Sequence, residues 1–298
     1  MSESGIDAER RSFNAWALTP SLIVLFAIAV LPAIYLVVTS LTPFQLTLPG
    51  SATDFSAPLR NYGLLPGDPR FVNSLVVQAK LSFWGVLFQV LIGMLLALLL
   101  NVPSRFVEFA RTFFLIPMVL PPIVVAVIWK LIYTPDISPL YYAAQALNFT
   151  MPALTSSVDF ALTAIVIADT WEWLPFTFLM VLAALQTIPD EYSEAALVDG
   201  ASKLQIFWYV TLPFIMPILV ISGMFRLIDS VKAFPLIFLL TSGGPGTVTE
   251  VTNYYAYLLA FDTNEIGYSS AVTVVMLLLV CGISLGLVWM GRRREKLA

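Results

Sequence analysis

The residues of this sequence most able to do chemistry are ionisable side chains placed inside long apolar segments. Such a residue costs at least about 2.5 kcal/mol near the centre of a membrane, so it faces a cavity or a partner. Asp169 and Glu172 lie in one apolar segment, and helical spacing puts them on one face with Trp173 and Phe176. Carboxylates beside aromatic rings suit a ligand with many hydroxyls and patches of apolar CH, as a sugar has. We therefore expect this face to line a substrate path.

A second group of charges lies in a later apolar segment, where Arg226, Asp229 and Lys232 recur every three residues. On a helix these side chains form one stripe, which predicts a second wall of the same path. The alternative is structural: the stripe pairs with Asp169 or Glu172 between two helices and never touches substrate. Both interpretations stay open, and the two roles could coexist.

A polar loop between two apolar segments carries the third pattern. It reads Glu194-Ala195-Ala196-Leu197-Val198-Asp199-Gly200, then nine residues, then Val210-Thr211-Leu212-Pro213. Pro189 before it and Gly200 at its end are start and stop signals for a short helix. Small alanines allow close approach and Glu194 offers a charge-assisted contact, so the helix suits a groove on another protein. An ordinary amphipathic surface loop is the alternative.

The segment after this helix predicts a second one. Ser202 with Gln205 three residues later is the pattern of a capping box, so a helix should begin there and run into the next apolar segment. The loop should thus contain a helix, a sharp turn and another helix.

Composition defines the elements that position these residues. Of 298 residues, 59% are hydrophobic and 11% charged, with a mean hydropathy of +0.87, far outside the range of a soluble domain. We predict an all-α polytopic membrane protein with one transmembrane domain over residues 1–298. Six stretches can cross roughly 30 Å of hydrocarbon, with a loop at 186–211. They are residues 17–41, 73–100, 112–133, 160–185, 212–240 and 268–290.

Prolines interrupt two of these stretches. Pro117, Pro121 and Pro122 fall in the third, and Pro213 and Pro217 at the start of the fifth. Each removes a backbone hydrogen bond, so we expect bends at these points.

Basic residues predict the orientation. With six spans the two termini share a side, which carries nine basic residues against two in the opposite loops, Arg60 and Arg70. The nine are Arg10, Arg11, Arg105, Arg111, Lys203, Arg292, Arg293, Arg294 and Lys296. The positive-inside rule therefore places both termini and the 186–211 loop in the cytoplasm.

Several activities are excluded by what the sequence lacks. It has no histidine and a single cysteine, which excludes an internal disulfide, a Cys/His metal site and histidine acid–base chemistry. It also has no GxxxxGK[ST] loop for nucleotide phosphates and no nucleophile elbow. We expect no catalytic or metal-binding residues, no cofactor in this chain, and no nucleic-acid binding. An ATP-driven motor would have to be another chain.

At this point the residues resemble a family: the integral-membrane permease subunits of bacterial binding-protein-dependent ABC importers. The polar loop matches the family signature EAA–x3–G–x9–I–x–L–P, with Val210 in place of the isoleucine. Three further stretches resemble the carbohydrate-uptake group of the maltose and glycerol-phosphate type. They are Trp171-Glu172-Trp173-Leu174-Pro175-Phe176, Phe225-Arg226-Leu227-Ile228-Asp229-Ser230-Val231-Lys232-Ala233-Phe234 and Leu240-Thr241-Ser242-Gly243-Gly244-Pro245.

The resemblance implies a type I ABC importer permease fold with six transmembrane helices in the bacterial cytoplasmic membrane. It implies an assembly with a second, different permease, two ATPase subunits that bind ATP and Mg, and an external solute-binding protein. The helix with Glu194, Ala195, Ala196, Asp199 and Gly200 would couple to the ATPase, with Glu194 paired to a basic residue there. Larger relatives carry extra N-terminal helices and an external domain, and we expect only the six-span core here.

The charged and aromatic residues of these two apolar segments together make up the expected substrate path. They are Asp169, Trp171, Glu172, Trp173, Phe176, Arg226, Asp229 and Lys232.

Other classes of transporter remain as alternatives. The chain could be an ABC permease for a solute other than a sugar. It could also be a proton-coupled secondary transporter that uses Asp169 and Glu172 as a proton relay. A membrane-embedded enzyme is disfavoured by the missing catalytic groups.

Overall fold

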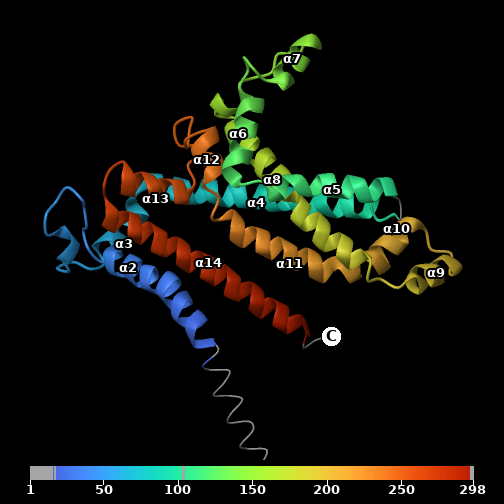
Figure 1. Ribbon diagram of the computed structural model, residues 1–298, viewed down its shortest axis with the longest axis horizontal. Helices are drawn as coiled ribbons and strands as arrows, with labels where there is room; N and C mark the ends of the chain where they lie inside the picture. The colour runs from blue at the N-terminus through green and yellow to red at the C-terminus, as the bar shows by residue number, and fades with distance from the viewer. Residues whose placement is uncertain (1–15, 17, 103–104, 296–298) are drawn as a thin grey trace, which may run out of the picture. The chain divides into compact units, whose positions relative to one another are not determined.

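The computed structural model describes residues 16, 18–102 and 105–295, and every regular element within these ranges is a helix (Figure 1). Arg10, Arg11 and Lys296, which contribute to the predicted orientation, lie outside them. The chain divides into two compact units. One holds the described residues up to Gly67 together with Ala256–Leu277, and the other holds Asp68–Tyr255 with the described residues from Leu278.

Five helices of the described chain are long and apolar enough to cross a membrane. They are Leu18–Ser40, Pro69–Leu99, Ala161–Leu185, Lys203–Ser230 and Ile266–Gly286. A sixth span results if the bent pair Val107–Val119 and Pro122–Tyr133 is counted as one. The shortest of the five, with 21 residues, is about 32 Å long at 1.5 Å per residue. That length matches the hydrocarbon core of a bilayer.

The first unit is built on the π-helical η1 (Phe26–Val30), α2 (Leu31–Ser40) and α3 (Arg60–Leu64), with the short 3-10 helices η2 (Ser51–Thr53) and η3 (Leu65–Gly67). Residues of α13 (Thr252–Phe261) and α14 (Ile266–Glu295) complete it. The Asn61 side-chain amide donates to the backbone oxygens of Ser40 and Thr42, both across 2.9 Å. Gly267 donates from its backbone to Phe44, and a Cβ there would lie 2.1 Å from the Thr42 oxygen. Only glycine therefore allows this approach of α14 to the segment after α2.

The second unit contains the remaining helices. They are α4 (Pro69–Leu99), α5 (Arg105–Val119), α6 (Pro122–Tyr133), α7 (Pro139–Ala146), η4 (Leu154–Ser156), α8 (Ala161–Leu185), α9 (Asp190–Val198), α10 (Lys203–Ile206), the π-helical η5 (Phe207–Thr211), α11 (Leu212–Ser230) and α12 (Pro235–Leu240). Asp68 caps α4 by accepting hydrogen bonds from the Arg70 and Phe71 backbones at 2.9 and 3.2 Å.

Helix α4 packs along α8 because its contact face carries small residues. A Cβ at Gly93 would lie 2.9 Å from the Cβ of Thr177 on α8, and one at Gly85 would lie 2.9 Å from the Asp169 carboxylate. Such residues let two membrane helices approach closely, so that polar groups on them can meet.

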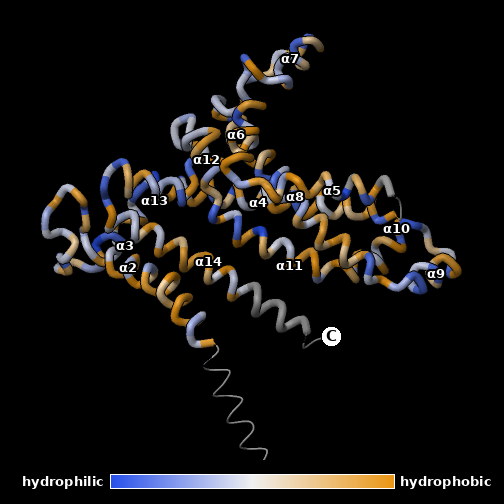
Figure 2. The backbone as a smooth tube through the Cα atoms, in the orientation of Figure 1, coloured by the Kyte–Doolittle hydropathy of each residue, from blue (hydrophilic) through white to orange (hydrophobic). Residues whose placement is uncertain are grey.

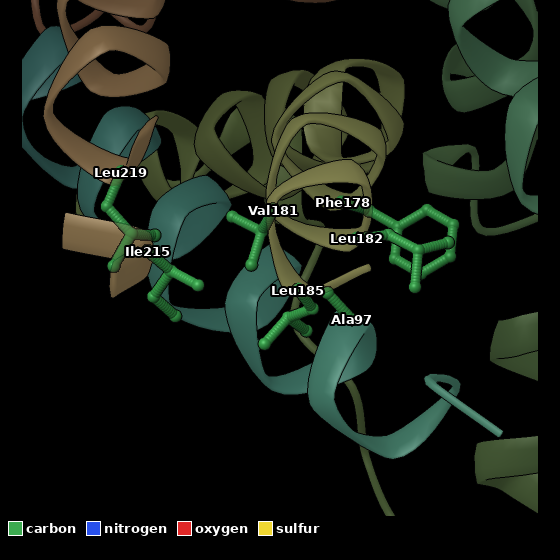
Figure 3. Packing of buried hydrophobic residues seen from close by; sticks show 7 residues of the cluster. All are labelled: Ala97, Phe178, Val181, Leu182, Leu185, Ile215 and Leu219. Atoms are coloured by element: carbon green, nitrogen blue, oxygen red, sulfur yellow. The ribbon is translucent and has the colours of Figure 1, made fainter. Parts of the chain in front are cut away.

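Seven buried apolar residues pack α4, α8 and α11 together (Figure 3). They are Ala97 from α4, Phe178, Val181, Leu182 and Leu185 from α8, and Ile215 and Leu219 from α11. These three helices form the frame on which the charged residues are mounted.

Two of the predicted stretches are each divided between two helices, and the first division falls at prolines where a bend is expected. The stretch 112–133 is divided between α5 and α6, which meet at 100°, because Pro121 has no N–H and adopts an extended conformation before α6 begins at Pro122. The stretch 212–240 is divided as well. Its helix starts earlier, at Lys203, and ends at Ser230, and Pro235 opens the separate α12.

The division after Ser230 changes the predicted stripe of charges. Helix α11 ends at Ser230, and Phe234, just before Pro235, has φ −137° and ψ −51°, outside helical geometry. Lys232 therefore lies beyond the end of α11 and not on its helical face.

Candidate functional site

The carboxylate of Asp169 lies at the contact of α4 with α8, where 5% of the residue is exposed. The side-chain amide of Gln89 on α4 donates to Asp169 Oδ2 across 2.7 Å and to the Asp169 backbone oxygen across 3.1 Å. Gly85, one turn away on α4, leaves the room that this carboxylate occupies. Partners of this kind offset the cost of burying a carboxylate.

The guanidinium of Arg226 on α11 completes the network. Its Nε donates to Gln89 Oε1 across 2.8 Å, and its Nη1 donates to Asp229 Oδ2 across 2.7 Å. Its Nη2 lies 3.7 Å from Asp169 Oδ1 and has no hydrogen-bond partner among the described residues. Only 2% of Arg226 is exposed, and this buried cation is compensated by the carboxylates of Asp169 and Asp229.

The indole ring of Trp173 covers the same guanidinium. The Arg226 Cζ atom lies 4.3 Å from the Trp173 ring centroid, which is a cation–π contact. One turn further along α8, the ring of Phe176 contacts that of Phe225 on α11 edge to face, with centroids 6.4 Å apart.

A cavity of about 130 Å³ opens beside this network, between α8 and the segment that joins α11 to α12. Its lining includes Asp169, Glu172, Trp173, Asp229 and Lys232. Glu172 is 2% exposed, and no hydrogen bond or ion pair joins its carboxylate to another described residue. Lys232 is exposed, and Asp229 is half-exposed. The structure thus brings five of the eight predicted path residues to one cavity, with Arg226 directly behind it.

The other two predicted residues, Trp171 and Phe176, do not line this cavity. Trp171 points to another face of α8, where its ring meets that of Trp129 edge to face at 5.8 Å. There it borders an apolar pocket of about 340 Å³ with Phe113, Phe114, Ile116 and Pro117 of α5. The reason is the helical period, because a residue two positions from Asp169 and from Trp173 lies on the opposite side of α8.

Sequence reasoning missed Gln89 and Gly85. The signal that could have found them is a row of small and polar residues at intervals of three or four along α4. The row consists of Ser74, Gln78, Ser82, Gly85, Gln89 and Gly93, all of them buried. Two other members of this row bind α11. Gln78 Nε2 donates to the Ser230 backbone oxygen across 3.0 Å, and the Ser82 and Ser230 hydroxyls share a hydrogen bond of 2.8 Å.

The polar loop folds as the helix, turn and helix predicted. Helix α9 begins after Pro189, and Gly200 adopts a left-handed φ of +81° in the turn that follows it. The capping box is confirmed. The Ser202 backbone donates to the Gln205 side chain across 2.8 Å, and the Gln205 backbone donates to the Ser202 hydroxyl across 3.4 Å.

Most of the surface of helix α9 is exposed. Glu194, Ala195, Asp199 and Gly200 are exposed and Ala196 is half-buried, while 57% of Leu197 and 88% of Val198 are exposed. One internal contact ties the helix to α11, where the Tyr192 and Phe214 rings have centroids 5.3 Å apart. Figure 2 shows hydrophilic residues gathered on α9 and its turn, beyond the apolar parts of α8 and α11.

Comparison with known proteins identifies the class. Residues 89–296 match the family of the binding-protein-dependent transport system inner membrane component, and the chain belongs to this family. It is 35% identical over 280 residues to a probable ABC transporter permease protein of Sinorhizobium fredii, which covers 94% of this chain and 90% of the relative. It is also 33% identical over 237 residues to a trehalose/maltose transport system permease protein of Thermococcus litoralis, with 80% of each chain covered.

The fold has a close counterpart among solved structures. The chain superposes on a chain of a bacterial ABC transporter involved in the import of the acidic polysaccharide alginate with a TM-score of 0.84. The match covers 98% of this chain and 99% of the other, at 21% sequence identity. The protein therefore has the all-α, membrane-spanning fold of type I ABC importer permeases. As a member of the family it is a permease subunit, a transport component of an inner membrane ABC importer.

Proposed function

We propose that this chain is the membrane-spanning permease subunit of an ATP-driven, binding-protein-dependent sugar importer. The observation that carries the proposal is the cavity of α8 and α11, in which the buried carboxylate of Glu172 lies beside the Trp173 ring. Polar groups that orient hydroxyls next to an aromatic ring that covers apolar CH suit a sugar. The name of the Thermococcus litoralis relative, a trehalose/maltose permease, supports the same substrate class.

The complete importer needs other chains. A cavity of about 130 Å³ is smaller than the about 300 Å³ or more of ordinary ligand pockets, so a second permease subunit or an opening motion must enlarge it. The sequence has no phosphate-binding loop, and two ATPase subunits would bind ATP and Mg. An external solute-binding protein would deliver the sugar, in line with the solved alginate transporter in complex with its periplasmic protein.

The orientation follows from charge. The excess of basic residues on one side supports a cytoplasmic location for both termini and for α9. Helix α9 would then dock on an ATPase subunit through its exposed Glu194, Ala195 and Leu197 surface. Closure of the ATPase dimer would move α9, and the Tyr192–Phe214 contact would pass the motion to α11 and the Arg226 network.

The test is reconstitution of the chain with its partner subunits in proteoliposomes. The saccharide that protects the cognate binding protein against thermal unfolding identifies the substrate to be labelled. We expect uptake of that saccharide to require internal ATP and the binding protein, and to persist with an uncoupler while ATP is held constant. Uptake that collapses with the uncoupler would instead indicate a proton-coupled carrier, and a non-saccharide ligand would refute the sugar assignment.

A further inference from the structure

We propose that Glu172 sets the charge preference of the substrate path. The cavity that Glu172 lines would accept hydroxyl or amino groups of the substrate and disfavour carboxylate, phosphate or sulfonate groups. This inference rests on the proposed function, since it names the class of sugar that the same cavity admits: neutral or amino saccharides.

The first argument is that Glu172 has no cation of its own. It is 2% exposed, it lines the cavity, and no described residue forms a hydrogen bond or an ion pair with it. Arg226 is already engaged by Asp169, Asp229 and the Gln89 side chain. A carboxylate that is buried without a partner is unfavourable for the protein alone, so a donor from outside the chain is its natural complement.

The second argument is the balance of charge around the cavity. When all groups are ionised, the three carboxylates of Asp169, Glu172 and Asp229 exceed the two cations of Arg226 and Lys232 by one negative charge. Their positions differ as well. Lys232 is exposed, where water screens it, whereas Glu172 is buried, where a charge acts more strongly. An anionic substituent next to Glu172 would therefore be repelled, and Lys232 could compensate it only near the exposed surface.

The third argument is size and shape. A cavity of about 130 Å³ is smaller than the pockets that hold whole ligands, which measure about 300 Å³ or more. It admits a substituent of a sugar ring and not the whole ring. The group that reaches Glu172 is thus small, as a hydroxyl, hydroxymethyl or amino group is, while Trp173 at the same cavity can cover the apolar side of the ring.

The experiment uses the purified complex of this chain with its partner subunits in lipid nanodiscs. Three matched probes are methyl glucoside, methyl glucosaminide and methyl glucuronide, whose weak affinities are measured by saturation-transfer NMR. We expect the first two to bind at least about tenfold more tightly than the glucuronide, from the repulsion argued above. In Glu172→Gln, which keeps the size and removes the charge, this ratio should fall below about threefold.

The control is Glu108→Gln, an exposed glutamate on α5 outside the cavity, which should keep the wild-type ratio. Equal binding of glucuronide and glucoside by the wild type, or an unchanged ratio in Glu172→Gln, would overturn the inference and leave the sugar function standing. If none of the probes binds the wild type, this inference fails, whereas the proposed function is decided separately by the uptake experiment described above. Should Glu172→Gln not assemble, the wild-type ratio alone decides.

Discussion

The guanidinium of Arg226 on α11 and the carboxylate of Asp169 on α8 lie 3.7 Å apart, and the side chain of Gln89 on α4 bridges them with two shorter hydrogen bonds. Each of the three helices contributes one member, and the charged groups are buried. An amide is suited to this position because it donates to the carboxylate and accepts from the guanidinium at the same time. The network therefore ties α4 to both helices of the proposed path.

Replacing the bridging amide tests this function directly. Gln89→Met keeps the length of the side chain and removes its three hydrogen bonds, which leaves polar atoms of Asp169 and Arg226 unsatisfied. We expect the free energy of unfolding to fall by about 2–4 kcal/mol, since each such atom costs about 1–3 kcal/mol. Denaturant unfolding in detergent measures the change. Gln145→Met, on an exposed residue of α7, should change it little, and equal effects would show that Gln89 is not a bridge.

The Arg226–Asp229 pair can be tested by a double-mutant cycle on thermal unfolding. Arg226→Gln should destabilise the protein more than Asp229→Asn, because Arg226 is buried while 44% of the Asp229 side chain is exposed. The two changes together should cost less than their sum, with a coupling of about 1 kcal/mol. Additive effects on unfolding, combined with altered uptake, would assign both residues to the substrate path alone.

Gly85→Ala tests the close approach of α4 to α8. The new methyl group would lie 2.9 Å from Asp169 Oδ2, and moving either helix disturbs the network. We expect a loss of about 1–3 kcal/mol in the free energy of unfolding, as for other overpacked sites. Gly282→Ala on α14 is the matched control, since its methyl group meets nothing within 4 Å and alanine favours a helix. A loss as large in Gly282→Ala would remove the argument.

Two changes in the α9 region test the proposed coupling to the ATPase. Glu194→Lys reverses an exposed charge on α9, and Gly200→Val forces a branched side chain into a left-handed conformation. Both variants should insert and fold but lose ATP-driven uptake. Valine in a left-handed conformation should not by itself abolish uptake. Gly50→Val, where φ is +82° and space is equally open, should therefore transport normally. Normal stimulation of ATP hydrolysis in Glu194→Lys and Gly200→Val would refute the assignment.

Trp173 and Trp171 offer an internal comparison on one helix. Trp173→Ala removes the ring from the cavity and from Arg226, so we expect uptake to fall at least about tenfold while basal ATP hydrolysis persists. Trp171→Ala alters the apolar pocket beside α5 and should reduce uptake far less. Initial rates of uptake in proteoliposomes distinguish the two. A larger loss in Trp171→Ala would move the substrate path to the other face of α8.

Features that depend on neighbours in the chain could be predicted from the sequence. The apolar runs define most of the membrane-spanning helices, and Pro189, Gly200 and the Ser202–Gln205 pair define the helix-turn-helix of the polar loop. The three-residue spacing of Arg226 and Asp229 likewise places the two charges on one face, and they form an ion pair of 2.7 Å. These outcomes follow from the geometry of one helix, in which spacing alone decides which side chains meet.

The tertiary structure decided which helices turn their polar faces toward one another and at what depth. Spacing along α8 and α11 indicates neither that Gln89 of α4 lies between Asp169 and Arg226 nor that Gly85 makes room for the carboxylate. The spacing also does not indicate that α11 ends at Ser230, so that Lys232 lies beyond the helix. Nor does it indicate that Trp171 faces α5. The physical reason is that the helical period relates residues within one helix. The rotation and depth of a neighbouring helix are determined by packing, and here the glycines of α4 permit that packing.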